Sequence, residues 1–359
     1  MTSGISDNIP CDVIRFKPVF KQMVWGGSRM REEFGYEIPG DDTGECWAIA
    51  AHRHGDCEID GGEYDGKTLS WLWKNKPELF GRPQGYEVND DFPMLVKIID
   101  ARRDLSVQVH PDDKYALINE NGAKGKMECW YILDCKPDAT IIIGHNAKTH
   151  EELEDMIRND RWNELLREIP IRKGDFFQIF PGTVHAIKAG TMILETQQNS
   201  DITYRLYDYG RLQNGHPREL HIDKSLDVIK VPYDPDEEFV KGESMACDKP
   251  GRTGSYQKDP DNESLVDCEF YHVWHLKCHE GDRYYGKNGG FILCSVTDGD
   301  GKITVFPRQQ EKTSSYESGN GKTTPVRKGD HFMIPAGFGS FTTTGNLEMI
   351  CSVPEEYGD

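Results

Sequence analysis

The sequence lacks several features that would assign it to common classes of protein. Basic residues are outnumbered, with 42 Lys and Arg against 61 Asp and Glu, and the net charge is −19. No cluster of basic residues could follow a phosphate backbone, so no nucleic-acid partner is expected. No apolar run of about 20 residues occurs, which predicts no membrane span. The N-terminus has neither a basic start nor an apolar stretch and predicts no secretory signal.

Paired cysteines are missing as well. The ten cysteines are scattered, and no two of them form a Cys-x-x-Cys pair. This spacing does not match a zinc finger, and in a chain without a secretory signal free thiols are expected rather than disulfides. The predicted location is therefore the cytoplasm.

The chain instead contains many short apolar runs separated by Gly, Pro and Asp. This pattern is typical of a β-sandwich or barrel rather than of a parallel α/β sheet. The predicted strands are Met94–Ile99, Trp130–Leu133, Thr140–Ile143, Phe176–Phe180, Met192–Leu194, Phe291–Val296, Ile303–Phe306 and His331–Ile334. Residues 68–80 and 149–169 are predicted to be helical insertions. In the second, Thr149 with Glu152 forms a capping-box signature, and Leu153, Met156 and Ile157 fall on one helix face.

An internal repeat indicates two related domains. Residues 171–185 read IRKGDFFQIFPGTVH, and residues 326–340 read VRKGDHFMIPAGFGS. Both predict a turn, an alternating strand and a second glycine turn, which favours duplication. His185 in the first copy is Ser340 in the second, so only the first keeps a potential metal ligand. At 359 residues the chain can hold two domains, which we predict at 1–240 and 241–359, with a linker rich in Pro, Asp, Glu and Gly near the boundary.

Candidate metal ligands gather on the first copy of the repeat. Alternation in SVQVHPDD places Gln108 and His110 on one face of a strand, Glu128 begins the next strand, and His185 follows a Pro-Gly turn. A single histidine at a strand end is more often structural than a ligand. An amide oxygen, a carboxylate and two imidazoles together suit Zn²⁺ best, with Fe²⁺ or Mn²⁺ as alternatives.

SVQVHPDD resembles the metal-binding strand of the type I mannose-6-phosphate (phosphomannose) isomerases of the cupin superfamily. RFKPVFKQMVWGG, GECWAIAAH, GKMECWYIL and FPGTVHAIKAGTMILETQQNSDITYRLYDYGR resemble further blocks of that family in the same order. The likeness covers roughly residues 13–225 and is nearest to the short bacterial form. It implies a mainly β fold of two cupin-type (jelly-roll) barrels, only the first of which holds metal.

The resemblance also implies roles for individual residues. Metal ligands fall on Gln108, His110, Glu128 and His185, and the positions associated with the substrate phosphate fall on Ser106 and Lys97. Catalytic positions fall on Lys126, Glu195 and Arg205. Cys46 stands where the family often has Ser, outside the metal set.

The resemblance therefore implies an isomerase that interconverts mannose 6-phosphate and fructose 6-phosphate. A metal and a cation would stabilise negative charge as a proton moves between C1 and C2 through an enediol. Lys126, Glu195 or a metal-bound water could carry the proton. The alternatives are a non-catalytic sugar-binding or regulatory cupin, a cupin oxygenase, and an isomerase of another phosphorylated sugar. The phosphate-binding cations argue against the oxygenase. A monomer or homodimer is expected.

Other histidine and glycine patterns are weaker. His52 and His54 share the spacing of a ligand pair but have no partner set, which favours a solvent-facing turn. His272, His275 and His279 do not alternate as strand ligands would, so we interpret them as structural. The GKNGG stretch at 286–290 lacks the setting of a phosphate loop and predicts a hairpin turn.

Overall fold

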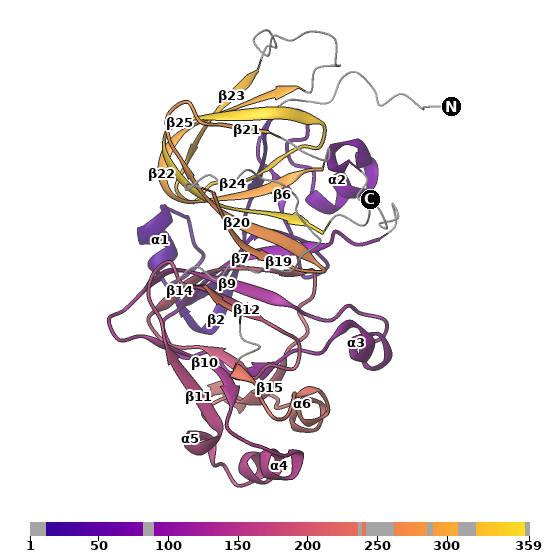
Figure 1. Ribbon diagram of the computed structural model, residues 1–359, viewed down its shortest axis with the longest axis vertical. Helices are drawn as coiled ribbons and strands as arrows, with labels where there is room; N and C mark the ends of the chain where they lie inside the picture. Colours follow the sequence, from indigo (N-terminus) through magenta and orange to yellow (C-terminus); the bar gives the residue numbers. More distant parts are fainter. Residues whose placement is uncertain are drawn as a thin grey trace. The chain divides into compact units, whose positions relative to one another are not determined.

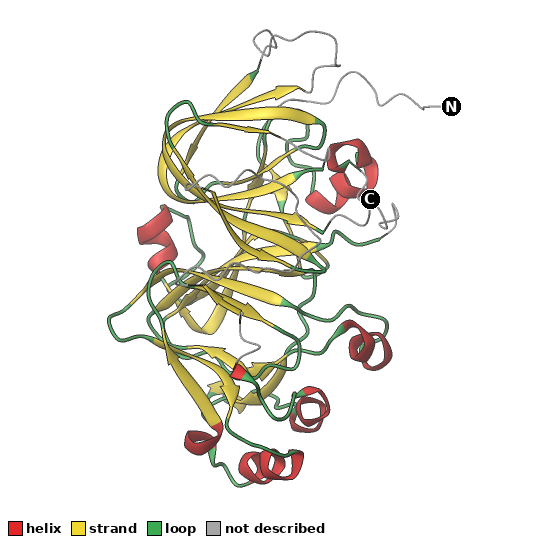
Figure 2. Ribbon diagram, in the orientation of Figure 1, coloured by secondary structure: helices red, strands yellow, loops and turns green. Residues whose placement is uncertain are grey.

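The structure is a computed structural model that describes residues 12–81, 90–235, 239–241, 262–285, 290–307 and 321–355. These residues form mainly β-strands with short helices, as the alternating runs predict (Figure 1, Figure 2). In the described part of the chain, none of the helices has the length and apolar character needed to cross a membrane. Most of 231–261 and all of 286–289 lie outside the described residues, and the predicted linker and the GKNGG turn lie there.

The chain forms two compact units, and each is built from separated segments. One unit contains Met1–Val19, Ala48–Pro93 and Cys247–Asp359, and the other contains Phe20–Trp47 and Met94–Ala246. These units do not follow a single division at residue 240. The reason is that β1 (Ile14–Lys17) pairs with β24 (His331–Ile334) and with β6 (Glu58–Ile59), so N-terminal segments complete a sheet of C-terminal strands. The division into a catalytic and a degenerate domain stays a prediction.

The unit of Phe20–Trp47 and Met94–Ala246 contains two antiparallel sheets. The larger sheet has the order β18-β12-β9-β14-β7-β2-β3. Its strands are β2 (Val19–Gly27), β3 (Thr43–Ile49), β7 (Met94–Ala101), β9 (Glu128–Cys135), β12 (Phe176–Ile179), β14 (Thr191–Gln198) and β18 (Phe239–Lys241). The smaller sheet has the order β11-β10-β13-β8-β15. Its strands are β8 (Val107–Val109), β10 (Thr140–His145), β11 (Leu166–Pro170), β13 (His185–Ile187) and β15 (Tyr204–Tyr207).

Two apolar clusters hold this unit together. In the first, Trp130 and Phe177 of the larger sheet pack with Ile141 and Ile187 of the smaller sheet, so the core lies between the sheets. In the second, the other face of the smaller sheet packs against α4 (His150–Arg158), α5 (Trp162–Leu165) and α6 (Ile222–Val228), which lie beside it in Figure 1. The two clusters cover both faces of the smaller sheet, which explains why β10 and β13 are buried along almost their whole length.

The predicted helical insertions are confirmed in part. Residues 68–80 form α2 (Leu69–Asn75) and the 3-10 helix η1 (Pro77–Phe80). Residues 149–169 contain α4 and α5, but the prediction is wrong for its last residues, which form β11. That segment pairs with β10 in the smaller sheet, and this long-range pairing overrides the local helical pattern. The other helices and short strands are α1 (Arg29–Phe34), α3 (Asp113–Asn119), β4 (Ala51–His52), β5 (Gly55–Asp56), β16 (Leu212–Gln213) and β17 (His216–Pro217).

The unit that includes Cys247–Asp359 contains a sheet of nine strands with a core of its own. Its further strands are β19 (Asn262–Asp267), β20 (Tyr271–Cys278), β21 (Arg283–Tyr285), β22 (Ile292–Pro307), β23 (Lys322–Arg327) and β25 (Phe338–Pro354). The two predicted strands Phe291–Val296 and Ile303–Phe306 belong to one long strand, β22. Gly299 and Gly301 are not turn residues. They lie where β22 approaches β25 so closely that a Cβ would meet the main-chain oxygens of Asn346 and Thr344.

The internal repeat has the same local structure in both units. Gly174 and Gly329 adopt φ values of 91° and 90°, a region that favours glycine. The following Asp175 and Asp330 each accept a hydrogen bond from the main-chain N–H three residues earlier, and β12 or β24 begins at once. All eight cysteines among the described residues are free thiols, as predicted.

The cap of α4 allows a test of the local folding argument. Thr149 Oγ1 accepts the Glu152 N–H at 3.2 Å, and the Glu152 side chain accepts the Lys148 N–H at 2.7 Å. We expect Thr149→Ala to lower the free energy of unfolding by about 1 kcal/mol, because it leaves a helix N–H without its acceptor. Urea denaturation followed by circular dichroism measures this change. Thr149→Ser keeps the oxygen and should retain most of the stability. An equal loss in both variants would contradict the capping role.

Candidate metal centre and active site

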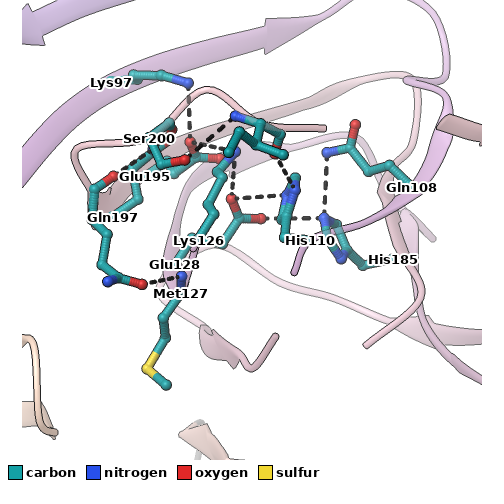
Figure 3. Close-up of polar contacts among 12 residues, drawn as sticks. Lys97, Gln108, His110, Lys126, Met127, Glu128, His185, Glu195, Gln197 and Ser200 are labelled. Carbon is teal, nitrogen blue, oxygen red and sulfur yellow. Dashed lines mark hydrogen bonds and ion pairs between the residues drawn. The ribbon is translucent and has the colours of Figure 1, made fainter. Parts of the chain in front are cut away.

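Strand pairing brings the four predicted metal ligands together. Gln108 on β8 lies directly opposite His185 on β13, and Arg205 on β15 lies opposite Gln108 on the other side. His110 follows the end of β8, and Glu128 begins β9 in the larger sheet. Directly opposed residues of antiparallel strands share a face. Residues distant in sequence therefore meet at one point, as Figure 3 shows.

Main-chain acceptors orient both imidazole rings. His110 Nδ1 lies 2.8 Å from the Ile202 carbonyl oxygen, and His185 Nδ1 lies 2.8 Å from the Thr183 carbonyl oxygen. A carbonyl oxygen only accepts, so each Nδ1 carries the proton and each Nε2 presents a lone pair. This is the arrangement in which metal-binding histidines are held.

Both Nε2 atoms face the same buried carboxylate. His110 Nε2 lies 3.4 Å from Glu128 Oε2, and His185 Nε2 lies 3.3 Å from Glu128 Oε1. The three side chains are at most 1% exposed, and their ligand atoms lie within 4.8 Å of one another. His110 Nε2 has no hydrogen-bond partner among the described residues. Lone pairs directed at a carboxylate repel it, and a cation between them removes the repulsion. The donor set therefore fits a divalent metal.

Gln108 completes the set of donors. Its amide nitrogen lies 3.3 Å from His185 Nε2 (Figure 3). A half-turn of the amide would present its oxygen, which is the metal-binding atom, at the same place. Carboxylate, amide oxygen and imidazole donors are compatible with Zn²⁺, Fe²⁺ or Mn²⁺.

Burial keeps the two histidines neutral and therefore able to bind a metal. It lowers the pKa of His110 to about 3 and also lowers the pKa of His185. Burial alone would raise the pKa of Glu128, but the nearby charge of Lys126 holds that pKa well below its usual value. The carboxylate is thus ionised while the imidazoles are not.

A chain of buried charges leads away from Glu128. Lys126 Nζ lies 2.8 Å from Glu128 Oε2 and 3.9 Å from Glu195 Oε1, which in turn lies 3.4 Å from Lys97 Nζ (Figure 3). Burial would lower the pKa of Lys126, but the charges of Glu128 and Glu195 raise it above its usual value. Burial and the charge of Glu128 raise the pKa of Glu195. Lys126 therefore holds a proton firmly, and Glu195 accepts one more readily than an ordinary glutamate.

These residues open into a pocket of about 570 Å³. Six of the nine predicted site residues line it, namely Lys97, Ser106, Gln108, Lys126, Glu195 and Arg205. The other three lie on the buried side: Glu128 contacts Lys126, His185 contacts Gln108, and His110 contacts Glu128. The structure thus brings together every residue that the sequence proposed for the site.

The sequence reasoning missed several residues of the pocket wall, among them Glu45, Trp47 and Arg218. Glu45 accepts the Trp47 indole N–H at 2.6 Å and lies 4.0 Å from Lys97 Nζ. Glu45 and Trp47 belong to the GECWAIAAH motif, so the family resemblance already marked this segment, but no role was assigned to either residue. Arg218 follows the last quoted family motif, which ends at Arg211, and no motif around Arg218 indicates a role for it.

The weaker histidine candidates take structural positions. His52 ends β4, and the exposed His54 lies in the turn of the β4–β5 hairpin, as predicted. In the other unit's sheet, His272 Nε2 lies 3.2 Å from Ser264 Oγ and His275 Nε2 lies 3.3 Å from Glu348 Oε2. No group of three potential ligands lies wholly within the described residues of that unit.

Solved structures with the same fold place the chain among the cupin-type isomerases. The mannose 6-phosphate isomerase of Bacillus subtilis aligns over 95% of this chain and 99% of its own, with a TM-score of 0.81 and 41% identity. A variant of the phosphomannose isomerase of Salmonella typhimurium aligns over 95% of this chain and 99% of its own, with a TM-score of 0.70. Because only 14% of the aligned residues are identical, this second match supports the shared fold alone.

Sequence comparison narrows the class to one family. Residues 13–128 match the type I phosphomannose isomerase catalytic domain, and residues 316–354 match the mannose-6-phosphate isomerase cupin domain. Mannose-6-phosphate isomerase ManA of Bacillus subtilis is 46% identical over 94% of this chain and 97% of its own length. Mannose-6-phosphate isomerase of Streptococcus mutans is 39% identical over 95% of this chain and 99% of its own length. The chain belongs to the type I phosphomannose isomerase family.

The metal site makes a prediction that does not depend on activity. Elemental analysis should find about one divalent ion per chain, and His110→Ala and His185→Ala should each lose most of it, because each removes a ligand. His331→Ala is the matched control. His331 is also a buried histidine, but its Nδ1 bonds Ser295 Oγ at 2.9 Å in the other unit's sheet. The His331→Ala protein should therefore keep the metal content of the parent. Equal metal content in all three variants would contradict the assignment.

Proposed function

We propose that the chain is a zinc-dependent isomerase that interconverts mannose 6-phosphate and fructose 6-phosphate, with Gln108, His110, Glu128 and His185 as the metal ligands. The observation that carries the proposal is that two buried imidazole lone pairs converge on one carboxylate beside a pocket lined by lysine, arginine and glutamate. Family membership supports the same reaction.

Zn²⁺ bound at this site would supply a Lewis acid for a substrate oxygen. Proton movement between C1 and C2 then needs a group that can take and return a proton at the pocket wall. We assign this role to Glu195, with Lys126 as the cation beside it that stays protonated and stabilises its charged form. The two residues line the pocket together, and Lys126 Nζ lies 3.9 Å from Glu195 Oε1.

Arg205 is the cation that we expect to stabilise the negative charge of the enediol. It lies opposite Gln108 across the β8–β15 pair, and its Nη1 donates to the Glu219 carbonyl oxygen at 2.8 Å. This contact anchors one side of the guanidinium, while Nε has no partner among the described residues. Ser106 and Lys97 remain our predicted contacts to the substrate. We further propose a cytoplasmic enzyme, monomeric or homodimeric.

A coupled assay with mannose 6-phosphate tests the proposed function. The metallated protein should convert mannose 6-phosphate to fructose 6-phosphate. Removing the metal with a chelator should abolish activity, and adding Zn²⁺ back should restore it, because the metal is the proposed Lewis acid for the substrate oxygen. Turnover that is unaffected by complete metal removal would refute the metal-dependent mechanism. A metallated protein without turnover would favour a binding role or another phosphorylated sugar.

Arg205→Lys tests the role of the guanidinium. Lysine keeps the charge but loses the planar arrangement of donors. We expect kcat to fall at least about tenfold, since removing one well-placed donor to a developing oxyanion costs about 10²–10³ in kcat. Metal content and thermal stability should stay unchanged. Arg158→Lys, an exposed arginine on α4, is the control and should behave like the parent. A change confined to KM would assign Arg205 to substrate binding alone.

A further inference from the structure

A buried carboxylate beside the pocket holds two arginines at once. Asp208 follows the end of β15 and is 5% exposed. Arg218 donates to it through Nε at 2.7 Å and Nη2 at 2.5 Å, and Arg211 donates to it through Nε at 3.1 Å and also through Nη2. Burial alone would raise the pKa of Asp208, but the hydrogen bonds from Arg218 and Arg211 bring the pKa below its usual value. The carboxylate therefore stays charged.

The two arginines differ in what they can do. Arg211 is also bound through Nη1 to the Asp104 carbonyl oxygen, so its donors are largely used within the protein. Arg218 lines the pocket, and its side chain is 12% exposed. Its bidentate pair with Asp208 uses Nε and one N–H of Nη2, so among the described residues both N–H groups of Nη1 remain available. Asp208 thus fixes the plane of a guanidinium whose free edge can bind a ligand.

Arg205 and Arg218 both line the pocket and bring two positive charges to it. Burial lowers the pKa of Arg205, and the neighbouring charge of Arg218 lowers it further, so the two pocket-lining cations repel each other. Asp201 and Glu219 also line the pocket, but the Glu219 side chain is 82% exposed, and water screens its charge. An anion between Arg205 and Arg218 would relieve the repulsion. Arginine is well suited to a phosphate group, which it binds through parallel N–H donors.

Lys97 is placed differently. Its Nζ lies 3.4 Å from Glu195 Oε1 and 4.0 Å from Glu45 Oε2, and it sits 5.2 Å from the centre of the Trp47 ring. Its side chain is only 6% exposed. Two carboxylates already neutralise this lysine, so a doubly charged phosphate beside it would also meet Glu45 and Glu195. The sugar hydroxyls are better partners for this group than the phosphate.

We propose that Arg218 binds the phosphate group of the substrate and that Asp208 is a positioning residue that aligns Arg218 for this contact. The inference rests on the proposed function in taking a sugar phosphate as the substrate. It moves the main phosphate contact from Ser106 and Lys97, where the resemblance placed it, to Arg218, whose charge acts on Arg205 in the same pocket.

Steady-state kinetics with mannose 6-phosphate compare Arg218→Gln, Lys97→Gln and Arg158→Gln. Loss of one charged hydrogen-bonding partner should raise KM roughly 10- to 100-fold in Arg218→Gln, and kcat should change much less. The inhibition constant of inorganic phosphate should weaken by a similar factor. Arg158→Gln removes the same charge from the surface and should match the parent in both constants. Lys97→Gln should leave the phosphate inhibition constant within about twofold of the parent.

The proposal is overturned if Arg218→Gln keeps both KM and the phosphate inhibition constant of the parent. It is also overturned if Lys97→Gln weakens phosphate inhibition as much as Arg218→Gln does. Arg218→Lys should recover part of the phosphate affinity, because it restores the charge without the bidentate geometry.

Asp208→Asn tests the positioning role. Asparagine has a similar shape and still accepts hydrogen bonds, but it cannot hold both arginines with a full charge. We expect a higher KM for mannose 6-phosphate, weaker phosphate inhibition, and metal content equal to the parent. Thermal melting identifies a variant that fails to fold. In the double variant with Arg218→Gln, the effect of Asp208→Asn on KM should largely disappear, because the residue acts through Arg218. Additive effects would refute the positioning role.

Failure of this inference can be told apart from failure of the proposed function. Calorimetric titration of the metallated protein with inorganic phosphate needs no turnover. Phosphate binding that depends on Arg218 in a protein without isomerase activity would support the subsite and refute the reaction. Isomerase activity with phosphate binding indifferent to Arg218 would support the reaction and refute the subsite.

Discussion

The site depends on two hydrogen bonds from imidazole Nδ1 atoms to main-chain carbonyl oxygens. They hold the Nε2 lone pairs of His110 and His185 toward Glu128 in a place that water does not reach. Without a cation, this arrangement sets two lone pairs against a carboxylate at 3.3–3.4 Å. The folding free energy of the β scaffold therefore maintains a cluster of donors that a metal would stabilise. The surrounding charges are arranged around this constraint.

Charge in the pocket is divided between two walls. Near the proposed metal ligands, Lys97 and Lys126 are matched by buried glutamates, which allows protons to be held in a confined space. Toward β15, Arg205 and Arg218 line the pocket. The buried Asp208 binds Arg218 there, together with Arg211. A substrate with a reactive carbonyl at one end and a phosphate at the other suits this division. The overall negative charge of the chain does not prevent it, because the relevant fields are local.

Both units use the same turn and strand, but for different purposes. The pairs Gly174 with Asp175 and Gly329 with Asp330 build the same turn. In the first copy the chain then continues to His185, whereas in the second it continues to Ser340 within the long strand β25. Such turns are required by backbone conformation, so they are visible in sequence whether or not a site is present. The turn itself does not require a histidine at this position, since Ser340 occupies it in the second copy.

The sequence alone predicted the β-rich fold, the repeat and the cap at Thr149, because alternation, glycine turns and capping motifs are local properties. Motif resemblance also named nine site residues, which the structure places close together. The sequence did not predict that 166–170 forms a strand, or that two apolar runs join in β22, because pairing with distant strands decides both. The resemblance predicts a phosphate contact at Ser106 and Lys97. We propose Arg218 instead, because a lysine in a motif is recognisable from sequence but its contacts with Glu45 and Glu195 are not. Which cation is free to bind an anion depends on which carboxylates lie within a few ångströms of it. Only the tertiary structure determines those neighbours, by the register of strands that are far apart along the chain.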